Sequence, residues 1–94
     1  MSVWIAAGGD GALVEPDDAR VSAFDHGVTV GDGVFETIKV VDGKPLALTR
    51  HLHRLSRSCD VLGLATPDNS SLTDAVSSVI SSQPEAARLG RLRI

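Results

Sequence analysis

The sequence predicts an α+β domain in which an antiparallel sheet has two helices packed on one face. Two amphipathic helical stretches and one alternating strand followed by a hairpin dipeptide carry this prediction. The 94 residues suffice for one compact domain, which we expect to span residues 1–94. A content of 43% apolar and 22% charged residues allows a buried core beneath a charged surface.

The N-terminal residues predict a short hairpin. Apolar residues 3–7 and 12–14 flank residues 8–11, which are three glycines and one aspartate. Glycine and aspartate favour tight turns, so the two apolar runs are expected to pair. Residues 21–24 are a candidate for a further short extended piece. Residues 25–33 contain three glycines and are expected to form a loop.

Residues 34–41 are the clearest predicted strand. The side chains divide between two faces, with Val34, Glu36, Ile38 and Val40 on one and Phe35, Thr37, Lys39 and Val41 on the other. The first face is the more apolar and is expected to meet the helices. Asp42-Gly43 is a dipeptide typical of type I′ hairpins, so residues 44–48 are expected to return antiparallel.

Two helices are expected after this hairpin. The first begins at a cap formed by Thr49 and ends at Gly63, and its apolar face carries Leu52, Leu55, Cys59 and Leu62. The second opens with an approximate capping box from Ser71 to Asp74, and its apolar face carries Leu72, Ala75, Val76, Val79 and Ile80. Residues 90–94 alternate as a strand does and stop in mid-pattern, which is typical of a cut chain.

Composition excludes several classes of protein. With 9 Lys and Arg against 12 Asp and Glu, the net charge of −3 gives no excess of cations for a nucleic-acid platform. The single cysteine, Cys59, leaves no disulfide framework and too few thiols for structural zinc. The chain has no signal-peptide pattern and no apolar run long enough for a membrane span, so we expect a cytoplasmic protein.

Several motifs have an ordinary structural explanation. Gly31-Asp32-Gly33 precedes a strand rather than a helix, so it does not fit a dinucleotide fingerprint. His51 and His53 lie about 200° apart around a helix and cannot share a metal, so we expect no metal site and regard these histidines, with His26, as solvated or capping. Asp25 beside His26 is better explained by a turn than by an acid–base pair.

For two groups of residues, spacing alone does not decide between a solvated surface and a binding site. Phe35, Thr37 and Lys39 are either a solvated surface or the floor of a pocket. The helix face opposite the leucines, with Arg50, His53, Arg54 and Arg57, is favoured as a solvated basic surface. Arg54 lies at the edge of that face, where a guanidinium can reach an anion such as phosphate.

The segment from Phe24 to Pro45, with Gly31-Asp32-Gly33-Val34-Phe35-Glu36, followed by His51-Leu52-His53-Arg54-Leu55, resembles the class IV aminotransferases. This family of fold-type IV pyridoxal-phosphate enzymes includes branched-chain and D-amino acid aminotransferases and 4-amino-4-deoxychorismate lyase. The resemblance implies that Arg54 holds the cofactor phosphate. It also implies that Phe35, Thr37 and Lys39 line the substrate side of the pocket, and that the Thr37 hydroxyl assists proton transfer or orients the substrate.

The resemblance also implies what this chain lacks. The lysine that binds the cofactor covalently is expected on a strand beyond Ile94, in a second domain, because the positions of Lys39 and Lys44 do not match it. We therefore expect the N-terminal domain of a homodimeric enzyme that neither catalyses nor stably binds pyridoxal phosphate alone. An aminotransferase for a small amino acid and keto acid, a deoxychorismate lyase and a non-catalytic binding or dimerisation module remain open. Threonine at position 37 favours the lyase.

Overall fold

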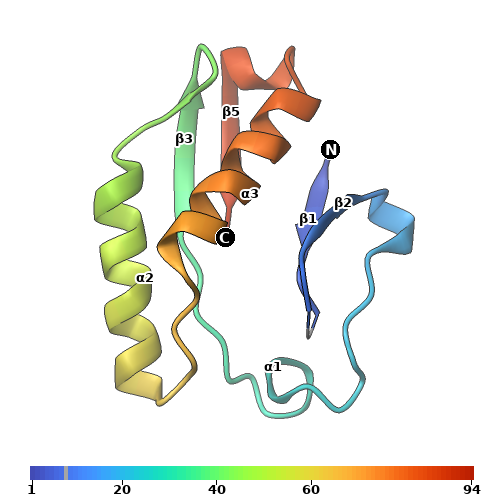
Figure 1. Ribbon diagram of the computed structural model, residues 1–94, viewed down its shortest axis with the longest axis vertical. Coiled ribbons are helices and arrows are strands. Elements are labelled where there is room, and N and C mark those ends of the chain that lie inside the picture. Colours follow the sequence, from blue (N-terminus) through green and yellow to red (C-terminus); the bar gives the residue numbers. More distant parts are fainter. Residues whose placement is uncertain (8) are drawn as a thin grey trace.

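The computed structural model describes residues 1–7 and 9–94. Strands β1 (Val3–Ile5) and β2 (Ala12–Val14) pair antiparallel, with Val3 opposite Val14, which confirms the N-terminal hairpin. Gly8, part of the turn expected between them, lies outside the described residues. The hairpin forms a two-stranded sheet of its own and packs beside the second long helix (Figure 1).

The connection that follows β2 contains no strand among its described residues. A 3₁₀ turn spans Pro16–Asp18, and the short helix α1 spans His26–Thr29. The prediction of an extended piece at residues 21–24 is wrong. The Asp25 amide donates to the Ser22 carbonyl at 3.0 Å and closes a turn there. The Asp25 side chain accepts from the Gly27 amide at 2.8 Å, so this aspartate acts as a helix cap.

The main sheet contains β3 (Thr37–Val41), β4 (Lys44–Pro45) and β5 (Leu89–Arg93) in the order β4-β3-β5, with antiparallel pairing throughout. Asp42 and Gly43 have φ angles of 48° and 75°, which confirms the type I′ turn. The return strand is shorter than expected, because Ala47 takes a left-handed conformation that starts the first helix. Residues 34–36 precede β3, although Glu36 and Ile94 still exchange two backbone hydrogen bonds.

The two long helices form where the apolar periodicity places them, with different N-terminal caps. Helix α2 (Leu48–Leu62) follows Ala47, so Thr49 lies inside the helix and caps nothing. It ends at Gly63, which has a φ of 68°, as expected. Helix α3 (Asn69–Ser82) is capped by Asp68, whose carboxylate accepts from the Ser71 amide at 2.8 Å. This hydrogen bond lowers the pKa of Asp68, and the capping box expected from Ser71 is therefore wrong.

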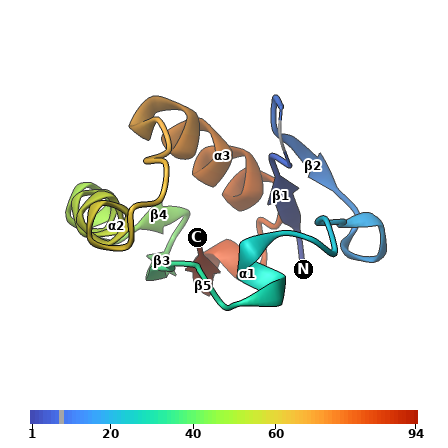
Figure 2. The same ribbon diagram turned by 90° about the horizontal axis from the view of Figure 1, so that it is seen from below.

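Both long helices cover the same face of the main sheet, which confirms the predicted architecture (Figures 1 and 2). Helix α3 lies over β3 and β5, and α2 runs alongside near β4. The central core cluster joins the sheet to α3 and the turn before β5 and contains Ile38, Val40, Val76, Ala87 and Leu92. Three residues of the predicted stripe on α2 are buried as well: Leu52, Leu55 and Cys59. In the described part of the chain, no helix has the length and hydropathy to span a membrane.

Candidate functional site

The sheet face turned away from the helices carries the predicted pocket residues. Ile38 and Val40 point into the core, so the alternating Phe35, Thr37 and Lys39 point outward and are exposed. The Phe35 side chain is 61% exposed, which is unusual for a large aromatic ring. This outer face is therefore open for contact with another group.

Strand β5 adds two cations to the outer face. Thr37 lies opposite Arg93, and Lys39 lies opposite Arg91. The Arg93 guanidinium lies 4.2 Å from the centre of the Phe35 ring, in a cation–π contact. Among residues 1–7 and 9–94, no carboxylate pairs with Lys39, Arg91 or Arg93. The outer face is thus an aromatic and cationic surface that can receive carboxylates.

The sequence alone did not place Arg91 and Arg93 here. Residues 90–94 were expected to be a strand, but the partner and register of that strand were not predicted. Their alternation is the only signal, and it becomes informative once β5 is known to pair with β3.

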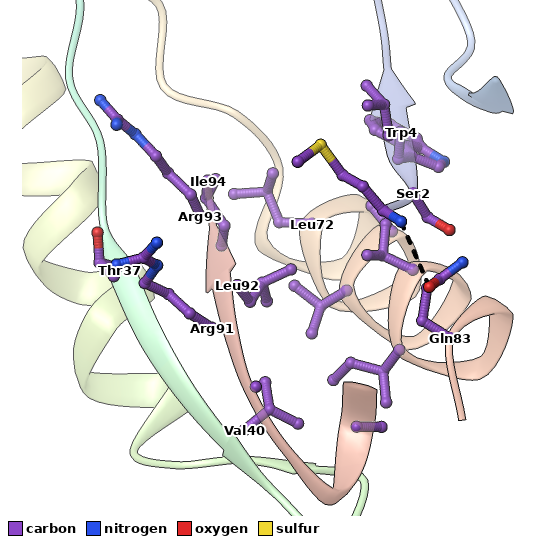
Figure 3. A pocket seen from close by; sticks show the side chains of 18 residues that line it. Ser2, Trp4, Thr37, Val40, Leu72, Gln83, Arg91, Leu92, Arg93 and Ile94 are labelled. Carbon is purple, nitrogen blue, oxygen red and sulfur yellow. Dashed lines mark hydrogen bonds between the residues drawn. The ribbon is translucent and has the colours of Figure 1, made fainter. Parts of the chain in front are cut away.

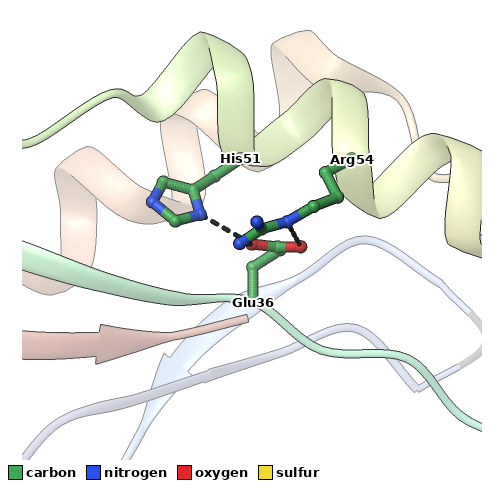
Figure 4. Close-up of polar contacts among 3 residues, drawn as sticks. All are labelled: Glu36, His51 and Arg54. Atoms are coloured by element: carbon green, nitrogen blue, oxygen red, sulfur yellow. Dashed lines mark hydrogen bonds and ion pairs between the residues drawn. The ribbon is translucent and has the colours of Figure 1, made fainter.

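A second polar cluster lies at the start of β3, on the face that meets α2 (Figure 4). Glu36 is only 5% exposed. The Arg54 guanidinium donates two hydrogen bonds to its carboxylate, from Nε to Oε1 and from Nη2 to Oε2, each 2.7 Å long. His51 Nδ1 lies 2.6 Å from Oε2 of the same carboxylate. A carboxylate only accepts hydrogen bonds, so Nδ1 carries the proton in this contact.

These contacts stabilise the charged form of Glu36. Hydrogen bonds from Arg54, and then from His51, lower the pKa of Glu36 from 4.5 to about 2, against the opposing effect of burial. The pairing with Glu36 in turn raises the pKa of Arg54. Because the folded-state pKa of Glu36 is depressed, its contribution to stability is present above about pH 4.5 and is lost as the pH falls towards 2.

This cluster corrects two expectations. Arg54 does not lie in a purely solvated basic face, because one side of its guanidinium closes over a buried carboxylate. His51 is neither a solvated nor a capping residue, since it is 19% exposed and donates to Glu36. Glu36 itself was overlooked as a functional candidate. Its signal is visible in the sequence, since it is the one charged residue on the otherwise apolar face of residues 34–40.

Arg54 keeps the capacity to bind an anion. Its side chain is 60% exposed, and Nε and Nη2 carry its two hydrogen bonds to Glu36. The Nη1 amino group forms no hydrogen bond with any described residue, so its two N–H groups are free to donate. A phosphate therefore fits the open side of this guanidinium.

The other histidines do not form a metal site. His26 Nδ1 lies 3.7 Å from Asp32 Oδ2, and both side chains are at least half exposed. His53 is exposed on α2. Within the described residues, no three His, Cys, Asp or Glu side chains are placed to hold a metal ion.

A cavity of about 700 Å³ opens between β1, α3 and the free edge of β5 (Figure 3). Its walls are mainly apolar, with Trp4 from β1, Leu72, Val76 and Val79 from α3, and Leu92 from β5. Neither Glu36 nor Arg54 lines this cavity, and neither do Phe35 and Lys39. It is therefore separate from the Glu36 cluster, but it borders the outer face, because Thr37, Arg91 and Arg93 also line it.

Comparison with known proteins gives a consistent result. The sequence pattern of the family described as amino-transferase class IV matches residues 33–94. A Methanocaldococcus jannaschii protein, provisionally named a branched-chain-amino-acid aminotransferase, is 45% identical over 58 residues, which are 62% of this chain and 20% of that protein. The aminodeoxychorismate lyase of Bacillus subtilis is 45% identical over 49 residues, 52% of this chain and 17% of that protein.

Solved structures resemble the same part of the fold. A fold IV-transaminase from Curtobacterium pusillum has a TM-score of 0.76 and 38% identity over 88% of this chain and 29% of its own. A hypothetical aminotransferase from Mycobacterium tuberculosis has a TM-score of 0.81 and 34% identity over 89% of this chain and 30% of its own. That protein was solved in a PLP-bound form and in a form with α-ketoglutarate and PMP. The chain thus spans about a fifth of the length of its curated relatives.

Proposed function

Since the chain belongs to the class IV aminotransferases, we propose that it supplies the phosphate anchor and part of the substrate pocket of a pyridoxal-phosphate-dependent aminotransferase. The observation that carries the proposal is the Arg54 guanidinium, which is fixed on one side by Glu36 and open on the other. The non-catalytic module is the weaker alternative, because a surface used only for packing does not need a free, oriented guanidinium.

Arg54 would hold the cofactor through its phosphate. The free Nη1 group can donate to phosphate oxygens while the rest of the guanidinium remains on Glu36. When bound, pyridoxal phosphate draws electrons from the α-carbon of an amino acid and so makes its proton easier to remove. Binding and orientation of the phosphate are then the task of this domain.

The substrate would lie against the outer face of the sheet. Lys39, Arg91 and Arg93 favour carboxylates, and Phe35 offers an apolar surface beside them. These side chains suit a substrate pair, an amino acid and a 2-oxo acid, in which one member carries a second carboxylate. The Mycobacterium tuberculosis protein, solved with α-ketoglutarate, supports this choice of acid. The Thr37 hydroxyl, between Phe35 and Lys39, would orient the substrate or assist proton transfer.

The remaining parts of the enzyme are also a proposal. We place the cofactor-binding lysine in a second domain, outside residues 1–94, in a cytoplasmic homodimer. Phe24, Val28 and Val30 are 88%, 57% and 67% exposed near α1, and this apolar surface supports burial against another domain or subunit. Alone, the chain would neither catalyse nor retain pyridoxal phosphate.

Borohydride reduction tests the proposed absence of the cofactor lysine. Mixing the 94-residue chain with pyridoxal phosphate and reducing should give only scattered, substoichiometric labelling of its amino groups. Lys39 and Lys44 are exposed on the sheet, and neither lines the cavity between β1, α3 and β5. Mass spectrometry of peptides measures the labelling. Stoichiometric modification of Lys39 alone would show that this domain carries the lysine itself.

A second candidate, aminodeoxychorismate lyase, is favoured by Thr37 and by the Bacillus subtilis relative. Two assays on the full-length enzyme separate the candidates: transfer of an amino group from alanine or a branched-chain amino acid to α-ketoglutarate, and release of p-aminobenzoate from aminodeoxychorismate. We expect transfer to dominate. Release of p-aminobenzoate without transfer would identify the parent enzyme as the lyase and not the aminotransferase. If both activities were absent, the non-catalytic module would be the remaining candidate.

A further inference from the structure

We propose that Glu36 is a positioning residue, which fixes the Arg54 guanidinium so that its Nη1 edge faces the anion. The inference rests on the proposed function, because it concerns the same phosphate. It adds a role for a residue on the opposite side of β3 from Phe35 and Thr37. Glu36 touches neither the proposed substrate face nor the free side of the guanidinium.

The geometry supports positioning rather than simple charge neutralisation. When Nε and Nη2 of a planar guanidinium donate to a carboxylate, only Nη1 and the remaining Nη2 hydrogen can donate to another acceptor. A single point contact would leave Arg54 free to rotate, and its long side chain would have to be ordered when the phosphate binds. Holding the group beforehand removes that cost from the binding step.

Further contacts hold Glu36 in place beside Arg54. Its backbone exchanges two hydrogen bonds with Ile94, at 2.9 and 3.0 Å, which pair this point of the chain with the end of β5. His51 donates to Oε2 and lies one helical turn before Arg54 on α2. The carboxylate thus joins the sheet to two positions of the same helix. This arrangement sets the direction in which Arg54 leaves α2.

The test compares Glu36→Gln with Glu15→Gln, which removes one exposed acidic charge elsewhere. An amide has no charge and one acceptor oxygen instead of two, so it cannot accept from Nε and Nη2 of Arg54 on separate oxygens, as Glu36 does. We expect Glu36→Gln to weaken binding of inorganic phosphate and of pyridoxamine 5′-phosphate to the full-length apoenzyme by roughly three- to tenfold. NMR shifts of the Arg54 side-chain N–H signals during titration measure the binding. Glu15→Gln should leave it unchanged.

Two further readouts separate positioning from a general loss of stability. In the ligand-free wild type, rotation of the Arg54 guanidinium should be slow enough to give resolved N–H signals, and in Glu36→Gln these signals should average. On acidification, the wild type and Glu15→Gln should lose stability between about pH 4.5 and about pH 2, and Glu36→Gln should not show this loss. Glu36→Asp, which keeps the carboxylate, should restore part of the affinity.

The outcomes distinguish this inference from the proposed function. If wild type and Glu36→Gln bind both probes equally, or if the guanidinium rotates equally fast in both, Glu36 does not position Arg54 and the phosphate role survives. If neither probe perturbs Arg54 in the wild type, the phosphate role fails and the positioning role fails with it.

Discussion

Replacing Arg54 by alanine in the full-length enzyme is expected to weaken pyridoxal phosphate binding by about ten- to a hundredfold. The substitution removes a charge-assisted donor to the cofactor phosphate. Arg57→Ala is the matched control, because Arg57 lies on the same helix, is exposed and forms no ion pair with a described residue. Its removal should change the affinity little. Equilibrium titration of the apoenzyme, followed by cofactor absorbance, measures both.

Arg54→Ala is also expected to lower stability, because it leaves the buried Glu36 carboxylate with His51 as its remaining side-chain donor. The double variant Glu36→Gln, Arg54→Ala separates the two effects. It should recover part of the stability and none of the cofactor affinity. Equal losses of affinity in Arg54→Ala and Arg57→Ala would instead indicate diffuse electrostatic attraction, and the assignment of the phosphate to Arg54 would be wrong.

Leu92→Ala is expected to destabilise the domain by about 2–5 kcal/mol, because Leu92 is 9% exposed and belongs to the core cluster. Leu89→Ala should cost less than about 1 kcal/mol, since Leu89 lies on the same strand, points to the outer face and is 71% exposed. Urea unfolding measures the free energy of unfolding of both variants, so that the same Leu→Ala change is compared on the two faces of β5.

The difference between the two leucines also bears on function. A small cost at Leu89 leaves the outer face free to receive a substrate. A cost at Leu89 equal to that at Leu92 would mean that another part of the chain covers the outer face in solution. Phe35, Thr37 and Lys39 could not then line an open pocket.

Elements fixed by local chemistry were predictable from the sequence. The Asp42-Gly43 turn needs two positive φ angles, and the apolar stripes of α2 and α3 need a helical period, so each pattern is visible within a few residues. The helix starts were less predictable. Several neighbouring polar residues can cap a helix, and only the fold decides that Asp68 does so rather than Ser71.

The candidate site was predictable in part. Alternation along β3 and the family resemblance identified Phe35, Thr37, Lys39 and Arg54. The roles of Glu36 and His51 depend on the approach of α2 to the start of β3, which is a contact over 15 or more residues of chain. Arg91 and Arg93 likewise join the outer face through long-range pairing of β5. Such contacts follow from tertiary packing, and spacing alone does not specify them.

A crystal structure of the full-length enzyme with pyridoxal phosphate tests the central claim most directly. The quantity to measure is the distance from the Arg54 guanidinium to the cofactor phosphate. We expect a phosphate oxygen within about 3 Å of Arg54 Nη1, with Nε still bonded to Glu36. A phosphate held entirely by other groups, out of hydrogen-bonding reach of Arg54, would contradict the account.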